Sequence, residues 1–153
     1  PLRHSSAASD VYKRQLLIVG CQYQLVQNSS IELEKIEFGS SINNSFKAKT
    51  VKYFSINSSD NNLRLKILSV KFKKKNFYGG AAARAQQIEI IGELEYIFSN
   101  SVINKNGTLR TSSWIPVNEA NPLSEIVAQK TIIEELEFVL LEKLMEEYWS
   151  VES

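Results

Sequence analysis

A single cysteine, Cys21, and the residues just before it are the first candidates for chemistry. Leu16–Val19 is aliphatic, and Ile18-Val19-Gly20-Cys21 has the order of a bacterial lipobox: an aliphatic residue, a variable one, a small one and a cysteine. The cysteine of a lipobox is lipidated and becomes the new N-terminus. The alternative interpretation is a buried cysteine at the end of a short apolar strand. A lipid on Cys21 would anchor the chain to a membrane without a spanning segment.

The segment before this motif is short for a secretory signal. Pro1–Gln15 shows no hydrophobic period, although Lys13-Arg14 could supply the basic region of a signal. The aliphatic stretch Leu16–Val19 is shorter than the roughly 7–15 apolar residues that a signal peptide contains. We therefore expect residues 1–20 to be a truncated or artefactual signal-peptide region and residues 21–153 to form a single domain.

A basic run in the middle of the chain is the second candidate, and aromatic residues interleave with it: Lys71, Lys73, Lys74, Lys75 and Arg84, with Phe72, Phe77 and Tyr78. Lysines on an edge strand can simply prevent sheets from joining edge to edge. The functional alternative is a surface that binds the phosphate groups of a lipid or of a nucleic acid. A lipid-anchored, exported chain would meet lipid phosphates, so the lipobox favours the lipid.

Catalytic chemistry has little support in the sequence. It contains no Gly-rich phosphate loop and no Gly-x-Ser-x-Gly motif. Its one histidine is His4, and a single cysteine excludes an internal disulfide framework or a Cys-based zinc site. Glu134 and Glu137 share a face of the last predicted helix, where a solvated helix face is the common arrangement. We expect no enzymatic activity, no cofactor and no metal site.

The composition and the charge distribution of the chain indicate what kind of domain must carry these residues. The chain has 153 residues, of which 43% are hydrophobic and 23% charged, as in an ordinary globular domain. The formal net charge of +1 conceals two opposed halves, because residues 1–84 carry a net +9 and residues 85–153 a net −8. These two halves need not cancel on the folded surface.

Hydrophobic periodicity predicts the elements of the first half. Residues 31–38 alternate like a half-buried strand with one slip in phase, which indicates a bulge. Residues 42–56 place apolar residues at helical spacing, with Asn43, Asn44 or Ser45 as the N-cap. Residues 63–75 predict a basic strand, and residues 76–83 a connection.

The second half contains the clearest strand, at residues 84–99, where apolar residues alternate with glutamates. Asn106-Gly107 predicts a hairpin turn, and residues 108–117 the partner strand, with Pro116 at its end or on an edge. A helix of about 25 residues should follow, capped by Ser124, with an apolar stripe of Ile126, Ile133, Leu136, Leu140, Leu144 and Tyr148. We expect an α+β fold, a two-layer sandwich of a mostly antiparallel four-stranded sheet with two helices packed on one face.

The order of these features resembles the LPS-assembly lipoprotein LptE family over most of the chain. The residues that carry the resemblance are Cys21-Gln22-Tyr23-Gln24-Leu25, Ala83-Arg84-Ala85-Gln86-Gln87, Asn106-Gly107, Trp114, Asn121-Pro122 and Ala128-Gln129-Lys130. The resemblance implies a lipoprotein of the outer membrane, on the periplasmic side of a barrel lumen. Such a protein plugs an LptD-like β-barrel, helps it assemble and binds lipopolysaccharide on its way to the outer leaflet, without catalysis and without nucleic acid.

The resemblance also implies that basic residues contact lipopolysaccharide, one near the turn between the middle strands and one at the start of the last helix. The candidates here are Lys73, Lys75, Arg84 and Lys130, with Cys21 as the site of lipid attachment. Two other functions stay open. A different periplasmic lipid-binding lipoprotein would need a deep apolar pocket between sheet and helices. A nucleic-acid-binding module would use the Lys71–Lys75 strand and bind with steep salt dependence.

Overall fold

The computed structural model describes residues 30–57, 63–78, 85–117 and 121–152. Along the chain the elements are β1 (Ile31–Leu33), β2 (Lys35–Phe38), α2 (Asn44–Tyr53), β3 (Phe54–Ile56), β4 (Arg64–Tyr78), β5 (Ala85–Ser99), β6 (Asn104–Pro116) and α3 (Pro122–Glu152). The predicted signal region, the predicted lipidation site Cys21 and the candidate contact Arg84 lie outside the described residues.

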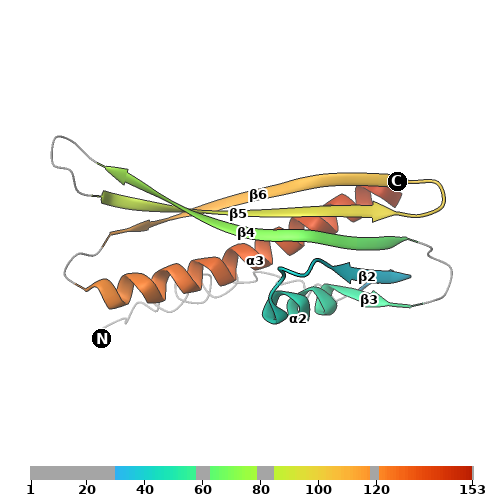
Figure 1. Cartoon of the computed structure of the whole chain (residues 1–153), viewed down its shortest axis with the longest axis horizontal. Helices are drawn as coiled ribbons and strands as arrows, with labels where there is room; N and C mark the ends of the chain where they lie inside the picture. Colours follow the sequence, from blue (N-terminus) through green and yellow to red (C-terminus); the bar gives the residue numbers. More distant parts are fainter. Residues whose placement is uncertain (1–29, 58–62, 79–84, 118–120, 153) are drawn as a thin grey trace, which may run out of the picture.

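The expected α+β fold is confirmed, with one small sheet in addition. The main sheet has the strand order β2-β4-β5-β6; β4, β5 and β6 pair antiparallel, whereas β2 pairs parallel to β4. A second sheet consists of β1 and β3 in parallel. Both helices lie on the same side of the long strands (Figure 1), so the main sheet has a core face toward the helices and an outer face away from them.

The predicted strand over residues 31–38 is two strands in two sheets. Leu33 is fully buried and Ile36 half-buried, yet a spacing of three puts them on opposite faces of one straight strand. The chain therefore bends at Glu34 instead of forming a bulge. The bend is fixed because the Glu34 backbone N–H donates to the Leu63 carbonyl at 3.0 Å and Arg64 donates to the Glu34 carboxylate at 2.8 and 3.0 Å.

Helix α2 begins as predicted and ends three residues early. Its N-cap is Asn43, whose Oδ1 accepts a hydrogen bond from the Phe46 backbone N–H at 2.7 Å. The helix was expected to reach residue 56, but Phe54–Ile56 forms β3 because β1 offers a strand to pair with, in the register Ile31 to Phe54. Phe54 is fully buried in that position.

The predicted hairpin turn at Asn106-Gly107 is wrong, because both residues lie within β6. The chain turns at residues 100–103, where Asn100 Oδ1 accepts hydrogen bonds from the backbone N–H groups of Val102 and Ile103 at 2.8 and 2.6 Å. Gly107 pairs with Tyr96, and a Cβ at this position would lie 2.6 Å from the Tyr96 Oη. The glycine thus makes room for an aromatic ring. Pro116 ends β6, an edge strand, as predicted.

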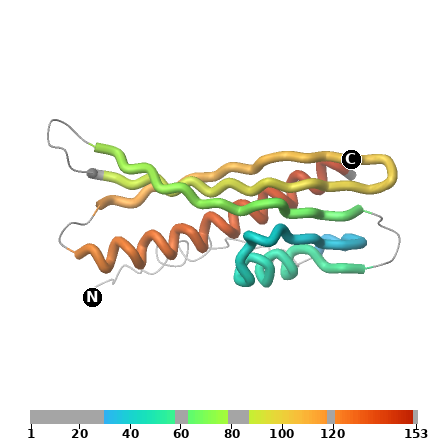
Figure 2. The backbone as a smooth tube through the Cα atoms, in the orientation of Figure 1, coloured from blue at the N-terminus to red at the C-terminus, as the bar shows by residue number. Residues whose placement is uncertain are grey.

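Helix α3 is longer than predicted and starts on a different cap. It has 31 residues and is therefore about 46 Å long. The Ser124 backbone N–H donates to Asn121 Oδ1 at 3.1 Å, so the side chain of Asn121, and not that of Ser124, caps the helix. Figure 2 shows that the first half of α3 extends beyond α2, beneath the far ends of the long strands.

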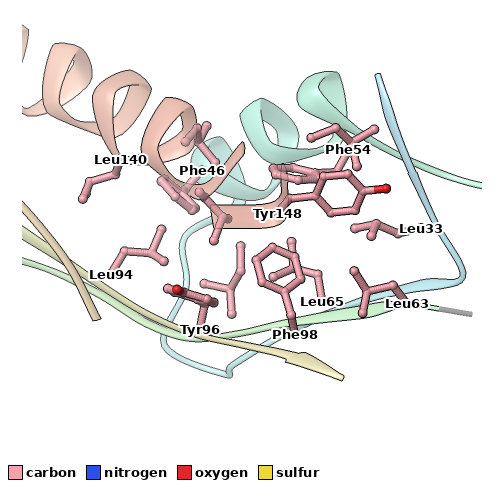
Figure 3. Packing of buried hydrophobic residues seen from close by; sticks show 14 of the residues in the cluster. Leu33, Phe46, Phe54, Leu63, Leu65, Leu94, Tyr96, Phe98, Leu140 and Tyr148 are labelled. Carbon is pink, nitrogen blue, oxygen red and sulfur yellow. The ribbon is translucent and has the colours of Figure 1, made fainter. Parts of the chain in front are cut away.

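The main hydrophobic core fills the space between the sheet and the second half of α3, with α2 closing its side (Figure 3). Its fully buried members come from every layer: Leu33, Phe46, Phe54, Leu65, Ile67, Leu94, Phe98, Leu140, Leu141 and Leu144. A smaller cluster, Ile88, Ile90, Ile115 and Leu136, lies under the other end of the sheet. The predicted stripe on α3 is buried only from Leu136 onward. Before that residue, Ile126 is 63% exposed and Ile133 is half-buried.

Candidate anion-binding surface

The register of β4 assigns the lysines of the basic run to two faces. Phe72 pairs with Gly92 and packs against the core, so it marks the core face. Lys71, Lys73 and Lys75 alternate with it and lie on the outer face, whereas Lys74 lies on the core face. Period two thus brings Lys73 and Lys75, two of the predicted contacts, onto one surface at the end of β4.

Glutamates of β5 neutralise part of this basic surface. Lys73 Nζ donates to Glu93 Oε2 at 2.5 Å, and Lys71 Nζ lies 3.9 Å from Glu95 Oε1. The Lys73 hydrogen bond lowers the pKa of the Glu93 carboxyl, so this pair stays charged near neutral pH. Lys71 and Lys73 are consequently paired with glutamates of the neighbouring strand, and the basic run is not an unbroken positive patch.

Lys75 differs from the other lysines of the run. Its Nζ lies 4.7 Å from the centre of the Phe77 ring, and among the described residues it has no carboxylate within ion-pair distance. The Phe77 ring in turn lies 4.5 Å from the ring of Trp114, centre to centre, at an interplanar angle of 53°. Trp114 is 47% exposed on edge strand β6. Lys75, Phe77 and Trp114, which we name the aromatic-cation patch, form a continuous surface.

Trp114 was not among the residues predicted for a site. It pairs with Glu89, which pairs with Lys75, so the three residues form one row across the outer face. The alternation of the strand indicates that Trp114 points away from the core. It does not give the strand register, which places Trp114 beside Phe77. A correct position for the β5–β6 turn would have been needed to find this neighbourhood.

Lys130 lies on the other side of the sheet from the patch. It is exposed on α3, which packs on the core face. The structure therefore does not bring Lys130 together with Lys73 and Lys75, although the last part of β4 and the first half of α3 lie toward the same end of the molecule (Figure 1). That end is held together because Lys74 Nζ lies 3.4 Å from Glu125 Oε1, and Gln129 Nε2 donates to the same oxygen at 2.8 Å. Leu123, Ile126 and Val127 on this half of α3 are exposed.

The carboxylates of α3 do not form an acid–base pair. Glu134 is exposed, whereas Glu137 is only 4% exposed and accepts a hydrogen bond from Lys49 Nζ of α2 at 2.6 Å. Lys49 Nζ also lies 4.7 Å from the centre of the Phe138 ring. Glu137 therefore joins α3 to α2, a role that the expected solvated helix face does not include.

The remaining surface of the described residues offers few other sites. An open pocket of about 370 Å³ is lined by Glu34, Arg64, Ser99, Asn100 and Ser101, where β4 begins and β5 ends, and so at the end of the sheet away from the aromatic-cation patch. No three histidine, cysteine, aspartate or glutamate side chains in the described ranges are arranged to hold a metal ion. Neither helix in this part of the chain combines the length and apolarity that membrane crossing requires.

Comparison with known proteins identifies the fold. No family model matches the chain, and no curated protein matches it. Among solved structures, the rare lipoprotein B of Shewanella oneidensis matches with a TM-score of 0.66 and 9% identity, over 79% of this chain and 96% of that chain. The chain has the fold of this lipoprotein.

Two further structures agree with that assignment. An uncharacterized lipoprotein B of Nitrosomonas europaea matches with a TM-score of 0.60 and 8% identity, over 75% of this chain and 79% of that chain. A minor lipoprotein of Acinetobacter baumannii matches with a TM-score of 0.58 and 10% identity, over 76% of this chain and 88% of that chain. All three are described as lipoproteins, and at these identities the likeness concerns the fold.

Proposed function

We propose that this chain is a lipid-anchored protein of the bacterial envelope, attached through Cys21, that plugs and helps assemble an LptD-like outer-membrane barrel and binds lipopolysaccharide in transit. The observation that carries the proposal is the shared fold with three proteins described as lipoproteins. The lipobox at Ile18-Val19-Gly20-Cys21 supports it independently, because it lies just before the folded domain.

The packing of the domain supports a plug over a lipid carrier. A carrier would need a deep apolar pocket between sheet and helices. In the described residues that space is occupied by Phe46, Phe98, Leu140 and Leu144, each with no exposed surface (Figure 3). A filled core gives a rigid body, which suits a protein that occupies the lumen of another protein.

The outer face supports the same proposal. A barrel lumen is polar, and this face carries ion pairs between neighbouring strands, such as Lys73 with Glu93 and Lys66 with Glu37. Charged side chains on both edges of the sheet also oppose further strand pairing. We assign Lys73, Lys75, Arg84 and Lys130 as the candidate lipopolysaccharide contacts, and we propose no enzymatic role and no nucleic-acid partner.

Capture from cells tests the proposal. The chain, expressed behind a complete signal sequence and tagged at its C-terminus, is expected to co-purify from detergent-solubilised outer membranes with a large β-barrel protein. Mass spectrometry should find diacylglycerol on Cys21. A Cys21→Ala variant is the matched control, which should lose the lipid and fractionate with soluble periplasmic proteins. Recovery of the lipidated protein from membranes without any barrel would refute the plug, and an unmodified Cys21 would refute the anchor.

A further inference from the structure

We propose that the aromatic-cation patch is a binding platform for the phosphorylated sugar part of lipopolysaccharide, with Trp114 stacking on a sugar ring and Lys75 meeting a phosphate. This proposal rests on the proposed function, and it assigns the ligand's glycan, not its acyl chains, to the outer face of the sheet. It adds the aromatic ring of Trp114 to the basic residues assigned under the proposed function.

The first step is the exposure of the rings. Tyr96 and Phe98 of the same sheet are buried in the core, whereas Trp114 is 47% exposed on the opposite face. Phe77 supports its ring at 4.5 Å, which fixes the orientation of a large apolar surface in water. A rigid exposed aromatic surface costs little conformational entropy when it binds a ligand. Such surfaces stack on the apolar C–H faces of sugars.

The second step is the cation beside the rings. Lys75 lies against Phe77 and, unlike Lys71 and Lys73, has no carboxylate within ion-pair distance among the described residues. Of the three outer-face lysines Lys71, Lys73 and Lys75, it is therefore the one that no carboxylate of the described residues pairs with, so its charge is available to an anion. A phosphate on a stacked sugar would accept a charge-assisted hydrogen bond from it.

The acidic residues nearby decide between ligand classes. Glu89 lies in the row between Lys75 and Trp114, and Glu93 and Glu95 follow on the same face of β5. These carboxylates would repel the continuous phosphate backbone of a nucleic acid that crossed the sheet. They are, in contrast, good acceptors for sugar hydroxyl groups. The patch is also an open face and not an enclosed apolar pocket, so it suits a glycan better than an acyl chain.

Fluorescence of Trp114 tests the platform directly. The chain has two tryptophans, so the Trp149→Phe protein reports Trp114 alone. Titration with chemically deacylated lipopolysaccharide, which keeps sugars and phosphates, is expected to shift this emission with saturation. Trp114→Ala should weaken binding of the same probe about five-fold, measured by calorimetry, whereas Trp114→Phe should keep most of the affinity because it keeps a ring. Lys75→Gln should weaken binding of the phosphorylated probe but not of a dephosphorylated one.

Matched controls separate the patch from general effects. Trp149 is 53% exposed in the last turn of α3, and this end of the helix lies far from the end of β4 that carries the patch (Figure 1), so Trp149→Ala removes a similarly exposed ring and should leave the affinity unchanged. Lys66→Gln removes an outer-face lysine near the start of β4 and should also be neutral. Circular dichroism and unfolding of each variant show that the fold is retained.

Three outcomes would overturn the platform. One is equal loss of affinity in Trp114→Ala and Trp149→Ala. Another is binding of intact lipopolysaccharide without binding of the deacylated probe, which leaves the proposed function standing but places the contact on the acyl chains. The third is a Trp114 response to a single-stranded oligonucleotide and none to the glycan. Failure to capture a barrel, with Trp114-dependent glycan binding intact, would instead refute the plug and keep the platform.

Discussion

Both halves of α3 carry large apolar residues, but the surroundings of these residues differ. In the second half, Leu140, Leu141 and Leu144 are completely buried against the sheet and α2. In the first half, Leu123, Ile126 and Val127 are each at least 60% exposed. The difference follows from α2, which covers only one end of the molecule, so that the first half of α3 packs on the sheet alone (Figure 2).

The comparison separates stability from binding. Burial of apolar surface is the main source of folding stability, so the end with α2 should supply most of it. The other end contains the aromatic-cation patch on the outer face and exposed apolar residues on the helix, and it is fastened by polar contacts such as Lys74 with Glu125. Substitutions at the two ends should therefore differ in effect, and the following predictions test this from the largest change to the smallest.

The largest contrast is between two leucines of the same helix. Leu140→Ala should lower the free energy of unfolding by about 3–4 kcal/mol, because it leaves a cavity in a close-packed core. Leu123→Ala, the matched control in the exposed half, should change it by less than about 0.5 kcal/mol. Urea denaturation followed by circular dichroism measures both. Equal losses would mean that the first half of α3 is as tightly packed as the second.

The second prediction concerns the ion pair where the halves of α3 meet. Glu137→Ala leaves the Lys49 ammonium group partly buried without its partner, and should cost about 3 kcal/mol of stability. Glu134→Ala, one turn away and exposed, should be nearly neutral. The double variant Lys49→Met/Glu137→Leu should recover most of the loss, since neither replacement needs an ionic partner. A double variant as unstable as Glu137→Ala would show that the loss came from packing and not from charge.

Part of this architecture is predictable from local sequence. The alternation of Ile88, Ile90 and Leu94 with glutamates predicts β5 because one face of a strand repeats every second residue. The N-cap of α2 is narrowed to Asn43, Asn44 or Ser45, of which the structure has Asn43, and Pro116 is assigned to a strand end or edge, because both features depend on a few neighbouring atoms. The fold class follows from the order of such elements.

The predictions from sequence are wrong where a residue distant in the chain determines the local structure. Gly107 looks like a turn residue, but its lack of a Cβ serves the ring of Tyr96, a partner that only the register reveals. Phe54 reads as the end of a helix until β1 pairs with it. The candidate site has the same limit: period two puts Lys73 and Lys75 on one face, but their different partners, Glu93 and Phe77, depend on how the strands align.

The third prediction concerns acid stability at the packed end. Glu147 accepts hydrogen bonds from Lys105 and from the Tyr96 hydroxyl at 2.9 Å, and these bonds lower the pKa of its carboxyl. Because the pKa of Glu147 is lower in the folded state, its ionised carboxylate stabilises the folded state above pH 4.5, the ordinary pKa. This contribution is lost as the pH falls through the lowered pKa of the folded state. Glu147→Gln should therefore lose less stability between pH 5 and pH 3 than the native chain. Parallel curves for the two proteins would contradict it.

The same network makes an opposite prediction in alkali. Burial, and then the hydrogen bond to Glu147, raises the pKa of Tyr96 to about 12. The neutral phenol is thus favoured in the folded state, so stability should fall as the pH rises above 10, the ordinary value. Tyr96→Phe removes this fall, and melting temperatures between pH 9 and pH 11 measure the difference. An unchanged fall in the variant would assign it to other groups.

The smallest effect is expected where the exposed half of α3 begins. Asn121→Ala removes the side chain that accepts from the Ser124 backbone N–H, and the loss of such a cap costs about 1 kcal/mol. Ser124→Ala should cost less, because the Ser124 hydroxyl donates to the Asn121 carbonyl at 2.8 Å, a bond that satisfies no backbone N–H group of the helix. Hydrogen exchange should show faster opening of the first turns of α3 in Asn121→Ala and unchanged protection around Leu140. If protection around Leu140 fell equally, the two halves of α3 would unfold as one unit, and the separation between a stabilising end and a binding end would not hold.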